Sequence, residues 1–129
     1  MITLDETRAV ALSLPEAGSE EHHGMESFRV RGRIFATVPD DDHVRVMVDG
    51  QEIEAAVAEY PDVCAPFWWG ARLACVVVTL AAADPGLVGE LLTEAWRRKA
   101  PKKLAALLDG ASGGAPETPR SSRPPSSLG

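Results

Sequence analysis

The sequence predicts an α+β fold in which an antiparallel sheet of about five strands packs against helices. Segments in which apolar and polar residues alternate are typical of half-buried strands, and 43–48 shows this pattern. Other segments, such as 87–96, carry apolar residues at helical spacing. The chain has 129 residues, the size of one domain that can bury a core without disulfides or metals. We therefore expect one folded domain over residues 1–110.

The expected helices begin at residues that cap helix N-termini. Thr3 is followed by Glu6 in a capping box, and Asp84 precedes a proline in the first turn. The expected helices run from Thr3 to Leu14, from Asp49 up to Pro61, from Asp84 to Lys99, and from Pro101 to a cap at Gly110.

The expected strands are separated by turn residues. They cover 28–31, 33–38, 43–48, 63–69 and 73–80, whereas 16–24 reads as a polar loop. Arg31-Gly32 predicts a tight hairpin turn, because glycine adopts positive φ there. Pro66 cannot donate to a ladder, so the strand at 63–69 is expected at an edge.

Residues 111–129 have a different composition. Ser, Pro and Gly dominate, and few apolar residues are present to offset the entropy of ordering, so a disordered tail is expected.

No apolar run approaches the ~20 residues that span a bilayer. Asp5 and Glu6 stand where a signal peptide would be basic, and the expected location is the cytoplasm, with Cys64 and Cys75 reduced and buried.

Several short sequence segments resemble those of the MmcQ/YjbR-like family. They are Leu12-Ser13-Leu14-Pro15, the hairpin word from Phe28 to Ala36, the apolar strand Cys75 to Leu80 and the helix ending Glu94-Ala95-Trp96. The resemblance covers about residues 1–108 and implies a CyaY (frataxin-like) fold with a double-wing DNA-binding role. The chain departs from the family pattern with Arg72-Leu73 entering the last strand and Asp49-Gly50 before the second helix.

Arginines around the expected first hairpin form a candidate nucleic-acid-binding site. Arg29, Arg31 and Arg33 crowd its turn, and Arg45 lies on the next strand. Together with Arg72 they could contact phosphates. The net charge of −6 argues against a general polyanion binder, so any DNA binding should be weak and salt-dependent. The alternative is a solvated hairpin whose charges serve solubility.

The aromatic run Phe67-Trp68-Trp69 is a second candidate site. Adjacent tryptophans in a strand point to opposite faces, so one could stack a base, bind a small ligand, or bury itself in a homodimer or against a protein partner. The usual fate of large aromatic residues favours the alternative, in which the core or a helix covers them.

A basic cluster lies between the last two helices and comprises Arg97, Arg98, Lys99, Lys102 and Lys103. We expect it to serve helix-end electrostatics, with a phosphate contact as the alternative.

The remaining polar residues show no spacing typical of a metal site or an enzyme. His22 and His23 are adjacent in a loop, and His43 follows three aspartates, without a supporting ligand pattern. We find no nucleophile-base pair or phosphate loop, so neither catalysis, a metal nor a cofactor is expected.

Overall fold

The computed structural model describes residues 1–22 and 24–113. These residues form an α+β fold with a six-stranded antiparallel sheet in the order β1-β2-β3-β4-β6-β5, which confirms the predicted fold class with one strand more. The strands are β1 (Ala17–His22), β2 (Met25–Val30), β3 (Arg33–Asp40), β4 (His43–Val46), β5 (Cys64–Trp69) and β6 (Arg72–Thr79). The helices are α1 (Leu4–Leu12), α2 (Gly50–Glu59), α3 (Pro85–Lys99) and α4 (Lys102–Gly113), with a short 3-10 turn, η1, at Leu80–Ala82.

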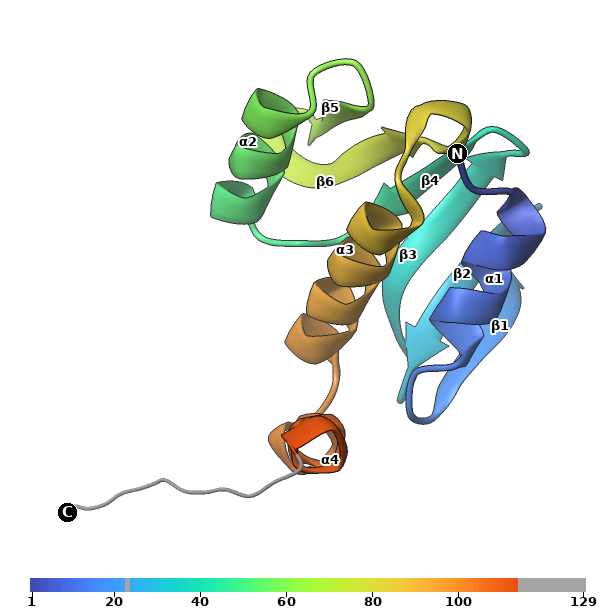
Figure 1. Ribbon diagram of the computed structural model, residues 1–129, viewed down its shortest axis with the longest axis vertical. Coiled ribbons are helices and arrows are strands. Elements are labelled where there is room, and N and C mark those ends of the chain that lie inside the picture. Colours follow the sequence, from blue (N-terminus) through green and yellow to red (C-terminus); the bar gives the residue numbers. More distant parts are fainter. Residues whose placement is uncertain (23, 114–129) are drawn as a thin grey trace, which may run out of the picture.

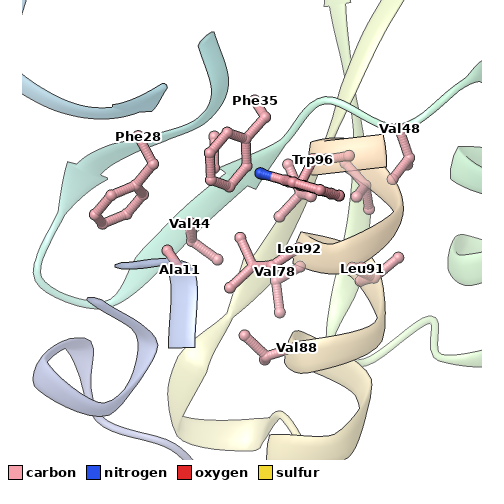
Figure 2. Packing of buried hydrophobic residues seen from close by; sticks show 14 of the residues in the cluster. Ala11, Phe28, Phe35, Val44, Val48, Val78, Val88, Leu91, Leu92 and Trp96 are labelled. Carbon is pink, nitrogen blue, oxygen red and sulfur yellow. The ribbon is translucent and has the colours of Figure 1, made fainter. Parts of the chain in front are cut away.

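The core lies between one face of the sheet and helices α1, α2 and α3 (Figure 1). Figure 2 shows Val88, Leu92 and Trp96 of α3 directed toward Phe35, Val44 and Val78 of the sheet. All six side chains are fully buried. Because alternate strand residues face opposite sides, one face of the sheet carries this core and the other is left to polar and aromatic side chains.

The predicted helix starts are confirmed. Thr3 and Glu6 form the capping box of α1, and the Asp49 and Asp84 carboxylates accept hydrogen bonds from backbone N–H groups at the starts of α2 and α3. The predicted cap at Gly110 is wrong, because α4 continues through it to Gly113. Glycine lowers helix propensity but does not forbid a helix. Residues 114–129, the larger part of the expected tail, lie outside the described residues.

The segment predicted as a polar loop contains strand β1. Its residues pair antiparallel with β2 from Ala17↔Val30 to His22↔Met25, at one edge of the sheet. An edge strand that is polar on both sides leaves no apolar alternation, so the sequence pattern missed it. The hairpin at Arg31-Gly32 therefore exists, but as the second hairpin of the sheet, between β2 and β3.

A β-bulge in β3 changes which of its residues face the core. Phe28 pairs with Ala36, whereas the next residue, Arg29, pairs with Ile34, so Phe35 is the extra residue. As a result, the consecutive residues Phe35 and Ala36 are both fully buried, although regular alternation would expose one of them. The Phe35 ring lies 6.4 Å from the Phe28 ring, centroid to centroid.

An ion pair attaches α1 to the sheet. Arg8 Nε and Nη2 donate hydrogen bonds of 2.9 and 2.8 Å to the two carboxylate oxygens of Glu26 in β2. These hydrogen bonds hold the pKa of Glu26 below its usual value. A carboxylate whose pKa is lower in the folded state adds stability above its unfolded pKa and loses it as the pH falls through the folded pKa.

We therefore expect Glu26→Gln to lower the free energy of unfolding by about 1 kcal/mol near neutral pH, the upper end of the range for partly exposed pairs. The difference from the wild type should shrink at an acidic pH, as the pH falls through the lowered pKa of Glu26 and the wild-type carboxyl itself becomes neutral. Urea unfolding at both pH values measures it. The control is Glu21→Gln, at the exposed β1 position paired with Glu26. A deficit that stays constant between the two pH values would contradict the linkage.

Candidate functional site

A groove of about 470 Å³ crosses the face of the sheet opposite the core. Its floor is built by alternate residues of the central strands, such as Thr37 of β3, Arg45 of β4 and Cys75 of β6. Thr37 pairs with Arg45 across β3 and β4, so their side chains lie together on one face. Asp49 and Gly50, at the start of α2, also contribute. A cavity of this size is typical of small-ligand sites.

Aromatic side chains of the β5–β6 hairpin line one wall of the groove. Phe67 and Trp69 are two residues apart on β5 and share a face, with 6.5 Å between their ring centroids. Trp69 is 70% exposed. Trp68, between them, is not part of the lining and is 55% exposed. The expectation that the core or a helix would cover the tryptophans is therefore wrong for both, which are exposed on the edge strand β5.

The turn of this hairpin places an arginine beside the aromatic wall. Gly70, with φ of +64°, and Ala71 connect the two strands, and Trp69 pairs directly with Arg72. A second bulge adds Ala74 to β6, because Phe67 pairs with Cys75 whereas Trp68 pairs with Leu73. Leu73, Ala74 and Cys75 consequently all line the groove.

Arg45 connects the floor of the groove to its aromatic wall. Its guanidinium carbon lies 4.4 Å from the centroid of the Phe67 ring, in cation–π geometry. Its Nε is buried and has no hydrogen-bond partner among the described residues. Buried donors in proteins are normally paired, so this N–H is an exception among the described residues.

The groove ends in a group of positive charges contributed by distant parts of the chain. Arg72 comes from β6, whereas Arg98 and Lys99 come from the last turn of α3. Arg98 Nη1 donates a 2.6 Å hydrogen bond to the Met47 carbonyl, which holds this turn against the end of β4. The pKa of Lys99 lies below its usual value, first because of burial and then because of the neighbouring Arg98, Arg33 and Arg72. This end of the groove is therefore electropositive in the free protein.

Among the described residues that line the groove, Asp49 is acidic and four are basic, namely three arginines and one lysine. Its Oδ1 accepts a 2.8 Å hydrogen bond from the Glu52 backbone N–H and so caps α2. The lining therefore carries a net positive charge, although the whole chain has a net charge of −6.

The structure separates the five arginines of the predicted nucleic-acid site. Arg45 and Arg72 line the groove, but Arg29, Arg31 and Arg33 do not. Arg29 is half-buried, and its Nε donates a 3.1 Å hydrogen bond to the Ser27 hydroxyl. Arg31, at the turn, donates two hydrogen bonds of 2.5 and 3.0 Å to the Glu16 carboxylate, so its charge is balanced. Arg33 donates a long 3.4 Å hydrogen bond to the Lys99 carbonyl and thus lies near the electropositive end.

The groove is lined by residues from two sets that the sequence analysis treated as separate candidate sites. Two predicted arginines and two predicted aromatic residues share one lining with Arg98 and Lys99, for which helix-end electrostatics was expected. The lining residues that sequence reasoning missed altogether are Met25, Thr37, Met47, Leu73 and Ala74 among others. The alternation around Arg45 and Met47 in 43–48 was the available signal, because it placed both on the face away from the core.

The structure also describes the surroundings of the residues that could ligate a metal and of the cysteines. Residues 1–22 and 24–113 contain no group of three or more His, Cys, Asp or Glu placed to hold a metal ion. Burial raises the pKa of the Cys64 and Cys75 thiols, which are free and buried. Over the same residues no helix has the length and apolar character needed to cross a membrane.

An antiparallel sheet with helices on one face and an aromatic, cationic groove on the other defines a small α+β protein with a groove on its sheet. The YjbR family model matches residues 12–98, and the chain belongs to the YjbR family. The crystal structure of the Deinococcus radiodurans protein DR2400, of the family-model domain DUF419, is similar to this fold. The two share 24% sequence identity with a TM-score of 0.69, over 91% of this chain and 97% of that one. No curated protein matches the sequence.

Proposed function

We propose that the protein binds nucleic acid in single-stranded form through the groove, with bases stacked on Trp69 and Phe67 and phosphates on Arg72, Arg98 and Lys99. The observation that carries the proposal is the exposed Trp69 ring in the same groove as four positive side chains. Proteins that bind single strands combine a positive groove with aromatic side chains on which bases stack.

The same geometry favours a single strand over a duplex. A base must leave its partner before its flat face can reach Trp69, and an unpaired strand needs no such opening. The arginines of the β2–β3 hairpin are less available for phosphate contacts with a duplex than the sequence suggested, because Arg31 is paired with Glu16. The negative net charge also opposes long-range attraction of a densely charged duplex.

A free nucleotide or similar planar anion is the second candidate. The groove volume of about 470 Å³ favours it, because cavities of this size hold single small ligands. Both candidates use the same aromatic wall and the same cations.

Trp69→Ala is expected to weaken binding of an oligothymidylate of about eight nucleotides by roughly ten- to a hundredfold, the effect of losing one stacked base. Fluorescence anisotropy at low salt measures the affinity. Trp68→Ala is the matched control, because Trp68 is an adjacent exposed tryptophan outside the lining. Equal losses in the two variants would contradict the groove.

The arginines allow a second matched pair in the same assay. Arg72→Ala should weaken binding and reduce its salt dependence by about one phosphate contact. Arg31→Ala, at the turn between β2 and β3, should leave both the affinity and its salt dependence unchanged because Glu16 already balances its charge. A larger loss for Arg31→Ala would instead support a site on the hairpin arginines.

A further inference from the structure

Four positive side chains meet at one end of the groove, where Glu52 interacts electrostatically with Arg98 and the other three lie beside it. Arg72, Arg98 and Lys99 line this end, and Arg33 reaches it through its hydrogen bond to the Lys99 carbonyl. The nearest acidic lining residue, Asp49, directs one oxygen to the N-terminus of α2. Assembling like charges in this way costs free energy until a counter-charge binds.

One side chain at this end is held in place before any ligand binds. Arg98 Nη1 is anchored at 2.6 Å on the Met47 carbonyl, whereas Arg72 is exposed, with its backbone paired to Trp69 in the hairpin. Arginine has five N–H donors, so each retains donors after these contacts. Positioned donors that need no rearrangement are typical of built anion sites.

We infer that this end of the groove is a subsite for a terminal phosphate, a phosphomonoester at a strand end or on a free nucleotide, which Arg72, Arg98 and Lys99 bind while Trp69 stacks the attached base. This inference rests on the function proposed above and names the part of the ligand that the subsite takes. A terminal phosphate carries a charge of about −1.5 to −2 near neutral pH, whereas a phosphodiester within a strand carries one. A cluster of three or four cations is better neutralised by the former.

The arrangement also fits the order of groups in such a ligand. Trp69 and Arg72 are cross-strand partners next to the Gly70 turn, so a stacked base and its phosphate would contact neighbouring residues. The Arg45 guanidinium lies against the Phe67 ring in the groove and so supports the aromatic wall. An internal nucleotide would also have to direct a second phosphate away from this end.

Isothermal titration calorimetry with two oligothymidylates of about eight nucleotides, one ending in a 5′-phosphate and one in a 5′-hydroxyl, tests the inference. The phosphorylated strand should bind about tenfold more tightly, as for one charge-assisted hydrogen-bond site. Lys99→Gln and Arg72→Gln should each reduce this preference to near unity. Lys103→Gln, on the next helix and outside the lining, should keep it. Thermal melts of each variant show that it is folded.

The outcomes separate this inference from the proposed function. Equal affinity of the two strands for the wild type, with binding still lost in Trp69→Ala, overturns the phosphate subsite and leaves the proposed function standing. Absence of binding by either strand overturns both. A third titration uses thymidine 5′-monophosphate. If the nucleotide binds as tightly as the phosphorylated strand, the subsite is supported and its source is the free nucleotide; if it binds more weakly, the source is the strand end.

Discussion

Trp96→Ala is expected to lower the free energy of unfolding by about 3–5 kcal/mol, the range for removing a fully buried large aromatic side chain. Trp96 is 0% exposed and lies between α3 and the sheet (Figure 2). Its indole Nε1 also donates a 2.9 Å hydrogen bond to the Pro15 carbonyl, which fixes the chain after α1. The variant leaves both a cavity and an unpaired carbonyl. Urea denaturation followed by circular dichroism measures the loss.

Trp68→Ala provides the comparison for that measurement. Trp68 is the same residue type but 55% exposed, so its truncation should change stability by less than about 1 kcal/mol. If the two tryptophan variants were equally stable, the buried place of Trp96 in the core would be disproved.

Phe35→Ala is expected to lower the free energy of unfolding by about as much as Trp96→Ala, roughly 3–5 kcal/mol. The bulge in β3 turns Phe35 into the core against Phe28, so its ring is fully buried. Its neighbour Ile34 is only partly buried, and Ile34→Ala should cost clearly less, about 1 kcal/mol. A reversed order of the two losses would show that β3 follows regular alternation and that the bulge is absent.

Such losses are large against the 5–15 kcal/mol that typically separates folded from unfolded domains. Both variants should therefore also shift the melting temperature by many degrees, since about 1 kcal/mol moves it by roughly 4–8 °C in a domain of this size. The two sites are not independent, because Trp96 and Phe35 point toward each other (Figure 2). A double variant is expected to lose less than the sum of the two single losses.

Much of the fold was predictable because its signals are local. The caps at Thr3, Asp49 and Asp84 and the valine alternation of β4 each depend on a few neighbouring residues, and the structure contains all of them. β1 could not be predicted, because it is stabilised by pairing with β2 and carries no apolar face of its own. The bulge at Phe35 depends in the same way on the register with β2.

The groove was predictable in its parts but not as a whole. Sequence spacing placed Arg45 opposite the valine face of its strand and suggested that one of Trp68 and Trp69 could be exposed. It could not show that the end of α3 meets the start of α2 and the β5–β6 hairpin, since these contacts join segments about thirty to fifty residues apart, as Arg98 and Met47 do. From the sequence alone, Arg98 and Lys99 were therefore interpreted as cations that favour a helix C-terminus. They do lie in the last turn of α3, but they also line the groove.

The two outer strands of the sheet have a consequence for behaviour at high protein concentration. Unpaired edges can join to those of other molecules and extend a sheet without limit. On β1 the exposed residues include Glu20 and Glu21, so two such edges would bring like charges together. On β5 Pro66 lacks the N–H that a joining strand would need. Both ends of the sheet thus oppose fibril-like growth, and Trp69 can remain exposed in the groove without its own edge strand promoting aggregation.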